Sequence, residues 1–340
     1  MRAQVFYGPG DLRYETLPVP EPSPGEVVLR IEAALTCGTD VKTLRRGHPV
    51  MIPKVPTVFG HEFAGTIAAV GSGVEGVRVG ERAVAANSAP CGRCAYCARG
   101  QANLCDDLLF VNGAYAEYII LPARVVAKNL VIVPATAAAA RVAFAEPVAC
   151  CLHAIDLAAI HPGESVAIFG HGPLGLTLGL LARAAGARVV LAGKAGPRLQ
   201  RAEGMGFAAC VDVTGMRDPA GGIRAALGGG ARCAIDATGR PEAWEQAVAA
   251  TDKGGTVIFF GGCLPGTSVR LDTRRVHYEE LRLLGAFHHT PALIRRAVTL
   301  LAEGVLDPRP LITHEMDLER VPEALALMSR GEALKVLINP

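Results

Sequence analysis

The stretch Ser165–Gly175, which reads S-V-A-I-F-G-H-G-P-L-G, decides the fold of this 340-residue chain. A β-type run leads into three glycines spaced G-x-G-x-x-G, and an Ala/Leu-rich segment follows to about Ala185. In a strand–turn–helix unit, Gly170 allows the tight turn, Gly172 lets the backbone approach a pyrophosphate, and Gly175 lets the helix pack closely on the strand. The N-terminus of that helix attracts phosphate oxygens with its positive dipole end. This context predicts a dinucleotide-binding unit.

The residues downstream repeat the alternation of strands and helices. β-type runs recur at Arg188 to Ala192, Cys233 to Asp236 and Thr256 to Phe260, with helical stretches between them. Strands that alternate with helices are typical of a parallel, doubly wound sheet. We therefore expect an α/β domain over residues 148–278.

The residues upstream have a different pattern. Short β-type runs, such as Gly65 to Val70 and Tyr118 to Leu121, are separated by Pro and Gly clusters, which predicts a compact, mostly β domain with long loops. The tail offers helices at Pro291–Glu303 and near Pro322–Ser329, and then a strand at Leu334–Ile338. We expect residues 1–147 and 279–340 to form this first domain together.

Charge and hydropathy exclude several classes of protein. The 34 basic and 32 acidic residues give a formal charge of +2 without a basic block, so a nucleic acid is not an expected partner. The richest apolar tract, Val131 to Ile160, is interrupted by Arg141 and Glu146 too soon for a bilayer span of ~20 residues. The opening residues also lack a secretory pattern. We expect a soluble, cytoplasmic protein that needs no disulfides.

Four cysteines lie close together in the stretch A-P-C-G-R-C-A-Y-C-A-R-G-Q-A-N-L-C. Their spacing, C-x2-C-x2-C-x7-C, lets one loop wrap four thiolates around a zinc ion, and closed sulfur coordination is typical of a structural site. An iron–sulfur cluster is the chemical rival, because C-x2-C-x2-C also opens ferredoxin motifs. Unconnected core thiols do not fit a loop this polar. The predicted ligands are Cys91, Cys94, Cys97 and Cys105.

A second set of candidate ligands is spread over the first domain. Cys37 lies in T-C-G-T-D, and His61 and Glu62 lie in F-G-H-E-F, each where a β-type run meets a glycine. Taken singly, such a cysteine is usually a buried core residue, and such a histidine is usually a hydrogen-bonded structural residue. Together with Glu146 they offer sulfur, nitrogen and carboxylate ligands, which suit a catalytic zinc that keeps one position open.

Seven motifs, in order along the chain, carry a resemblance to a known family: C-G-T-D, G-H-E-F-A-G, V-G-E-R-A, the four-cysteine stretch, A-E-P, G-H-G-P-L-G and D-A-T-G. Over essentially its whole length the chain resembles the zinc-dependent medium-chain alcohol dehydrogenases, and it is most similar to their sorbitol/threonine dehydrogenase (polyol) branch. The resemblance implies a GroES-like catalytic domain and a Rossmann domain, with the active site in the cleft between them.

The same resemblance implies roles for single residues. Cys37, His61 and Glu62 would hold the catalytic zinc, Glu146 would be a further ligand or a water-bridging carboxylate, and Thr39 would relay the alcohol proton. The four clustered cysteines would hold a structural zinc, which gives two zinc ions per chain. Zinc would act as a Lewis acid on the alcohol, so that hydride passes to a nicotinamide.

Two departures from the family pattern qualify these expectations. Lys42 stands where many relatives carry a relay histidine, so the outer proton path is in question. Asn87 and Ser88 stand where threonine dehydrogenases carry a histidine before the cysteine loop, which disfavours a strict threonine dehydrogenase. His288 and His289 are either loop residues or contacts to substrate or coenzyme.

The coenzyme is expected to be NADP, with NAD as the alternative. An NAD site has a carboxylate at the end of its second strand, and this chain has Gly193 and Lys194 there instead. Gly193 leaves room for a 2′-phosphate that Lys194 and Arg198 could neutralise. The predicted coenzyme-binding residues are Gly170, Gly172, Pro173, Leu174, Gly175, Gly193, Lys194, Arg198, Thr238, Gly239 and Gly261.

The sequence thus predicts a zinc-dependent NAD(P) oxidoreductase that interconverts a secondary alcohol, polyol or sugar-derived, and its ketone. A dehydrogenase or reductase for simple alcohols and aldehydes is the rival within the family. A non-catalytic NADP-binding protein is the rival from another class, and it should lack the Cys37 set of ligands. The resemblance also suggests a homodimer or homotetramer.

Overall fold

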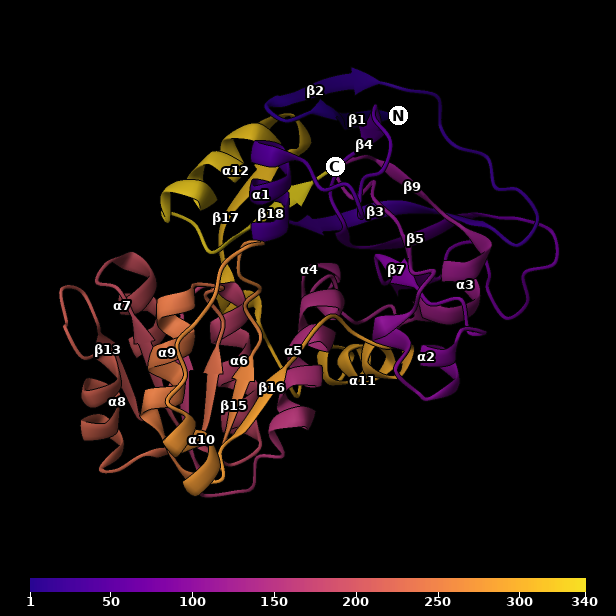
Figure 1. The fold of residues 1–340 in the computed structure, drawn as a ribbon. Helices are drawn as coiled ribbons and strands as arrows, with labels where there is room; N and C mark the ends of the chain where they lie inside the picture. Colours follow the sequence, from indigo (N-terminus) through magenta and orange to yellow (C-terminus); the bar gives the residue numbers. More distant parts are fainter. The chain divides into compact units, whose positions relative to one another are not determined.

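The structure is a computed structural model that describes residues 1–340. The chain forms two compact units, Met1–Ala149 with His289–Pro340, and Cys150–His288 (Figure 1). The sequence placed the two boundaries after residues 147 and 278. The observed boundaries lie two residues and ten residues later, the first of them inside α5 (Ala145–Ala158).

The second unit is built on a six-stranded parallel sheet with the order β13-β12-β11-β14-β15-β16. From β11, the strands run outward to β12 and β13 on one side and to β14, β15 and β16 on the other. This topology is the expected doubly wound one, and its switch point lies between β11 and β14. The strands are β11 (Ser165–Phe169), β12 (Arg188–Gly193), β13 (Ala209–Asp212), β14 (Ala231–Asp236), β15 (Thr251–Phe259) and β16 (Arg282–Gly285).

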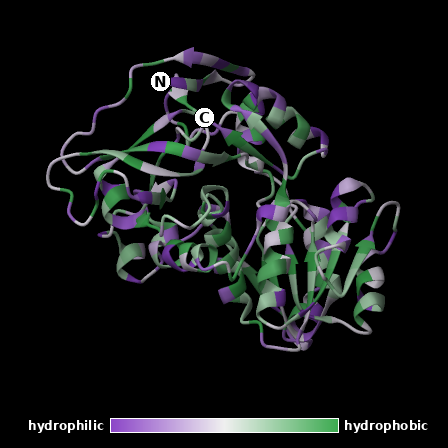
Figure 2. Ribbon diagram, turned by 180° about the vertical axis from the view of Figure 1, so that it is seen from behind, coloured by the Kyte–Doolittle hydropathy of each residue, from purple (hydrophilic) through white to green (hydrophobic).

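Helices flank this sheet, and apolar residues fill the space beneath them. Figure 2 shows the apolar residues concentrated along these strands. Ile223 of α8, Ala247 of α9, and Val190 and Val257 of the sheet belong to one buried cluster. The helices of the unit are α6 (Pro173–Ala184), α7 (Pro197–Glu203), α8 (Pro219–Leu227), α9 (Pro241–Ala250) and α10 (Thr273–Tyr278).

The strand β16 joins a different unit from the one the sequence assigned. Residues 279–288 were expected in the first domain, but Arg282 to Gly285 pair in parallel with Thr256 to Phe259 of β15. A run of four residues is too short for periodicity to indicate which sheet it joins. The pairing partner is decided by the register with β15.

The first unit contains a seven-stranded sheet with the order β10-β6-β5-β3-β18-β17, in which β9 also pairs with β3. The C-terminal strand β18 runs antiparallel to β3, with Leu337 opposite Leu35, so the tail completes this sheet. The strands are β3 (Val27–Leu35), β5 (Glu62–Val70), β6 (Arg82–Ala85), β9 (Tyr118–Leu121), β10 (Leu130–Ile132), β17 (Ile312–Asp317) and β18 (Lys335–Asn339).

Smaller elements surround this sheet. A three-stranded sheet has the order β2-β1-β4, and β7 pairs with β8 beside the cysteine-rich loop. These strands are β1 (Arg2–Gly8), β2 (Asp11–Thr16), β4 (Thr57–Val58), β7 (Ser88–Ala89) and β8 (Leu109–Phe110). The helices are α1 (Gly38–Arg46), α2 (Ala95–Ala98), α3 (Ala123–Asn129), α4 (Ala139–Val142), α11 (Pro291–Ala302) and α12 (Val321–Arg330), with short 3-10 turns at Ala102–Leu104, Arg309–Leu311 and Leu318–Arg320.

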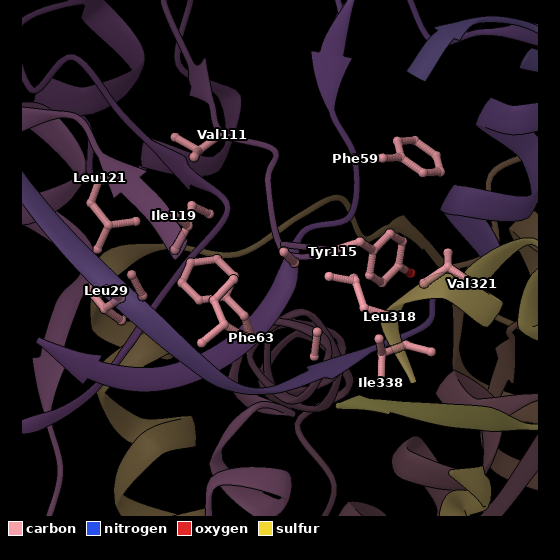
Figure 3. Close-up of a cluster of buried hydrophobic side chains, with 14 of the residues drawn as sticks. Leu29, Phe59, Phe63, Val111, Tyr115, Ile119, Leu121, Leu318, Val321 and Ile338 are labelled. Carbon is pink, nitrogen blue, oxygen red and sulfur yellow. The ribbon is translucent and has the colours of Figure 1, made fainter. Parts of the chain in front are cut away.

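The core of the first unit combines residues from both ends of the chain. Phe59 and Tyr115 pack against each other edge to face, with their ring centroids 5.9 Å apart. Figure 3 shows Leu318, Val321 and Ile338 of the C-terminal segment near them. None of the helices of the chain has the length and apolar character that a membrane crossing requires.

Candidate functional site

The first candidate metal set forms where strand ends meet in the seven-stranded sheet. Leu35, the last residue of β3, pairs with Glu62, the first residue of β5. Cys37 follows β3 by two residues and His61 immediately precedes β5, so this register places their side chains together. The ligand atoms of Cys37, His61 and Glu62 all lie within 4.8 Å of one another.

Asp40 holds two members of this set in place. Its Oδ2 accepts the Cys37 N–H at 3.0 Å, and its Oδ1 lies 2.9 Å from His61 Nδ1. Asp40 is the third residue of α1, and Cys37 caps that helix by accepting the Thr39 N–H on its sulfur at 3.4 Å. Because Nδ1 of His61 faces Asp40, Nε2 is the nitrogen that can bind a metal. Burial by itself lowers the pKa of His61, but Asp40 and Cys37 together raise it well above its ordinary value.

Glu62 is buried beside a lysine from the C-terminal strand. Lys335, the first residue of β18, forms an ion pair with Glu62 Oε2 and donates to the Thr36 carbonyl oxygen at 2.9 Å. Burial alone lowers the pKa of Lys335, but the attraction of Glu62 and Cys37 raises it overall.

The other carboxylate oxygen, Glu62 Oε1, is buried without a hydrogen-bond partner in the protein. A buried carboxylate oxygen is costly unless something binds it. Sulfur, imidazole and carboxylate are the donors of catalytic zinc sites that keep a position open, and the three residues therefore fit zinc.

Glu146 and Thr39 lie near this set without joining its ligand atoms. Glu146 lies in the first turn of α5, and its carboxylate lies within 4.8 Å of a ring nitrogen of His289. It does not lie within that distance of all three ligand atoms of the Cys37 set. It is still close enough to raise the pKa of Lys335. The direct ligand role of Glu146 therefore stays a prediction. Thr39 is half-buried at the second position of α1.

The cysteine-rich loop brings its four sulfurs together, within 4.8 Å of one another. Cys94 Sγ lies 3.9 Å from Cys105 Sγ, and the four cysteines form no disulfide. Four Zn–S bonds of about 2.3 Å give a tetrahedron with edges of about 3.8 Å. The spacing fits one ion, whereas an iron–sulfur cluster of several atoms would hold the thiolates farther apart. Backbone N–H groups of Arg93 and Cys94 point at Cys91 Sγ and lower its pKa.

The glycine-rich turn has the geometry that its motif predicts. A Cβ on Gly170 would lie 3.0 Å from Thr238 Cγ2, and a Cβ on Gly175 would lie 2.0 Å from the Gly170 carbonyl oxygen. Gly172, the N-cap of α6, instead faces open space. The third glycine thus serves close helix packing, and the second leaves the backbone N–H groups of the helix start accessible to phosphate.

A cavity of about 320 Å³ opens at the carboxyl ends of the parallel strands. Its volume lies within the usual range of ligand sites. Gly170, Gly193, Lys194 and Thr238 line it, as do His171 and Arg240. The other predicted coenzyme residues lie outside this lining: Gly172, Pro173, Leu174, Gly175, Arg198, Gly239 and Gly261.

Next to the cavity, the loop that contains Gly239 and the loop that contains Gly261 pack closely, backbone against backbone. Asp236 accepts hydrogen bonds from Thr238 Oγ1 at 2.7 Å and from the Gly239 N–H at 3.0 Å. A Cβ on Gly261 would lie 2.2 Å from the Gly239 nitrogen, so neither loop has room for a side chain there. Burial raises the pKa of Asp236 despite these donors.

The end of β12 has no space for the acid of an NAD site. A Cβ on Gly193 would lie 2.4 Å from Cγ of His171, whose ring covers this position. Lys194 follows as an exposed residue, and Arg198 lies half-buried at the second position of α7. Burial and the charge of Arg198 both lower the pKa of His171.

Comparison with known proteins decides the family. Residues 23–134 match the alcohol dehydrogenase GroES-like domain, and residues 173–303 match the zinc-binding dehydrogenase family. A sorbitol dehydrogenase of Bacillus subtilis (strain 168) is 31% identical over 100% of this chain and 97% of its own length. The chain belongs to the zinc-binding dehydrogenases. The family and the two-domain fold expected from the sequence are thereby confirmed.

Two further relatives of this dehydrogenase are informative. The L-threonine 3-dehydrogenase of Bacillus subtilis (strain 168) is 32% identical over 95% of this chain and 94% of its own length. A solved structure from Sinorhizobium meliloti 1021, described as a zinc-binding dehydrogenase bound to NADP, has 32% identity and a TM-score of 0.91. That alignment covers 100% of this chain and 99% of the other.

Three residues of the dehydrogenase sites were not found by sequence reasoning: Asp40, Lys335 and His171. Asp40 entered only as the last residue of the C-G-T-D motif, although an acid three positions after a helix cap is a capping signal. Lys335 opens an apolar strand, and a lone charge there signals a buried partner. His171 lies inside the glycine motif at a position that the motif leaves unspecified.

Proposed function

We propose that this dehydrogenase interconverts a secondary alcohol, polyol or sugar-derived, and its ketone with the help of two zinc ions and NADP. The observation that carries the proposal is the convergence of Cys37, His61 and Glu62, with one carboxylate oxygen unpartnered. The relative named sorbitol dehydrogenase supports the polyol class.

The first zinc is assigned to Cys37, His61 and Glu62, with Glu146 as a further ligand or a partner through water. When bound, zinc supplies Lewis-acid polarisation of the alcohol oxygen, and the coenzyme accepts the hydride. The second zinc is assigned to Cys91, Cys94, Cys97 and Cys105. Because four thiolates would leave no open position, its role is structural.

Thr39 is assigned the first step of the proton path. Its backbone N–H donates to Cys37 Sγ at 3.4 Å, which places the residue itself next to the metal set. Lys42 is exposed on the same helix, where many relatives carry a histidine. We therefore expect the proton to leave Thr39 Oγ1 without an imidazole relay at that position.

The preference for NADP rests on the end of β12. His171 occupies the space in which an NAD enzyme would carry an acid after the second strand. Lys194, Arg198 and the imidazole of His171 offer cationic or hydrogen-bonding partners to a 2′-phosphate. The relative from Sinorhizobium meliloti 1021 described as bound to NADP supports this choice.

We also infer a homo-oligomer. β16 is the outermost strand of the parallel sheet, and the nearby Tyr278 and Phe287 are 76% and 58% exposed. An open strand edge beside exposed aromatic side chains is suited to contact a second copy. Light scattering on the purified chain tests for a dimer or tetramer.

A panel of substrates tests the proposed activity. Polyols, sugar phosphates, amino-cyclitols, L-threonine and simple alcohols are assayed with NADP and with NAD. Polyol oxidation with NADP supports the proposal, and activity confined to simple alcohols or aldehydes favours the rival dehydrogenase. The buried Asn87, in place of a histidine typical of threonine dehydrogenases, leads us to expect no turnover of L-threonine.

Metal analysis separates the enzyme from a non-catalytic binding protein. We expect about two zinc ions per chain, and Cys37→Ser should lose one of them together with turnover while it keeps its fold. A wild-type chain that holds only one zinc, bound by the cysteine-rich loop, would favour the binding protein. Full activity in Cys37→Ser would refute the metal assignment.

A further inference from the structure

Tyr115 lies fully buried behind the first candidate metal set, in the loop that joins β8 to β9. Its hydroxyl donates to Asp40 Oδ2 at 2.5 Å and lies 3.4 Å from the Leu35 carbonyl oxygen. Figure 3 shows its ring within the core, close to Leu318 and Phe59. None of the motifs discussed above includes this tyrosine.

The backbone fixes the position of the tyrosine ring. The Tyr115 N–H donates to the Phe59 carbonyl oxygen at 2.8 Å, and the Gln4 N–H donates to the Tyr115 carbonyl oxygen at 2.8 Å. The ring lies flat against Gly60, where a Cβ would come within 2.7 Å of it. Gly60 has a φ of 85° and immediately precedes His61, so the Tyr115 ring packs against the backbone segment that carries His61.

The hydroxyl completes the contacts of a buried carboxylate. Asp40 is 1% exposed, and its two oxygens face the Cys37 N–H, His61 Nδ1 and the Tyr115 hydroxyl. A carboxylate with contacts on both oxygens cannot rotate without breaking one of them. The hydrogen bond from Tyr115 therefore fixes the orientation of the Asp40 carboxylate plane, and with it the contacts of Asp40 with Cys37 and His61.

We propose that Tyr115 is a positioning residue of the metal site, which acts through Asp40 to fix the geometry of Cys37 and His61. It touches neither metal nor substrate. The inference rests on the proposed zinc site at these residues. Outer partners of metal ligands typically change metal affinity by about 10–100-fold when they are removed.

Tyr115→Phe tests the proposal because it removes one oxygen and keeps the ring against Gly60. The chain is freed of metal and titrated with Co²⁺, whose visible absorption reports ligand geometry. Subtracting the spectrum of Cys37→Ser removes the contribution of the cysteine-rich loop. We expect Tyr115→Phe to bind Co²⁺ at this site about tenfold more weakly, with an altered band shape.

Tyr118→Phe is the matched control. It removes a hydroxyl three residues away on the same segment, where no bond to Asp40 exists, and it should bind Co²⁺ like the wild type. Melting curves of the metal-free chains report folding, and affinities are compared at a temperature at which each chain is folded. Wild-type affinity and band shape in a folded Tyr115→Phe would overturn the proposal, even if that variant melted lower.

The route through Asp40 is tested by combining two variants. If Tyr115 acts through the carboxylate, Tyr115→Phe should add little to the loss already caused by Asp40→Asn. Independent, additive losses would overturn that route. The outcomes also separate this inference from the proposed function, because failure of the zinc assignment would leave the wild type itself without Co²⁺ at Cys37.

Discussion

The buried ion pair between Lys335 and Glu62 gives the sharpest prediction about stability. Their side chains are 3% and 0% exposed, and Lys335 also donates to the Thr36 carbonyl oxygen. Lys335→Met keeps much of the aliphatic volume but leaves Glu62 as a buried charge without its cation. Removing one partner of such a pair costs about 3–5 kcal/mol.

This cost should depend on metal. In the metal-free chain Glu62 would lose the cation with which it forms an ion pair, so the full loss is expected. In the zinc-loaded chain the ion would supply positive charge to the same carboxylate, and we expect a smaller loss than in the metal-free chain. Because the first unit has about 200 residues, each kcal/mol lowers its melting midpoint by about 2–4 °C.

Circular dichroism melts with and without zinc measure both losses. The single tryptophan, Trp244, lies in the second unit, so its fluorescence serves as an internal control that should not change. The double variant Lys335→Met/Glu62→Gln removes both charges and should recover part of the stability lost without metal. A loss below about 1 kcal/mol in the metal-free chain, or an equal loss in both states, would refute this reasoning.

Three further predictions concern the coenzyme cavity and the cysteine loop. Gly193→Asp should weaken NADPH binding by about 10–100-fold, because the new side chain would meet the His171 ring and its charge would repel the 2′-phosphate. Fluorescence titration with NADPH measures the affinity, and unchanged binding would show that Gly193 does not belong to the coenzyme site. The pKa of His171 is lowered by burial and Arg198, although Asp212 opposes this, so the ring is mostly neutral near pH 7. The protonated ring attracts a phosphate more strongly than the neutral ring does. The ratio of wild-type to His171→Gln affinity for 2′,5′-ADP, measured by calorimetry, should therefore rise as pH falls below about 6.5. An affinity ratio that does not change with pH would exclude His171. Cys97→Ser should lose one zinc ion by metal analysis and keep the zinc at Cys37, and its cysteine-rich loop should become sensitive to proteolysis. Loss of both ions would mean that the two sites are not independent.

The cysteine loop and the glycine turn could be predicted because their parts are neighbours in sequence. Cys91 to Cys105 span a single loop, and the turn at Gly170 to Gly175 is set by backbone sterics at each glycine. Local spacing is enough to imply the chemistry in both cases. The Cys37 set was expected from the types of its residues and from the family resemblance, since residues this far apart carry no spacing signal of their own.

Other features depended on pairing between distant segments. Whether Arg282 to Gly285 joins the parallel sheet is decided by register with β15, which a four-residue run does not encode. Lys335 reaches Glu62 only because β18 returns to pair with β3 at the far end of the chain. The bond from Tyr115 to Asp40 likewise requires a loop from one segment to lie on Gly60 of another.

The sequence by itself determined which residues are candidates to bind metal and phosphate, because ligand type and glycine conformation are properties of single residues and short loops. The tertiary structure alone decided which buried groups hold those residues in place. Strand register brings Lys335 to Glu62 and core packing brings Tyr115 to Asp40, and both arise from long-range burial that local sequence patterns do not specify.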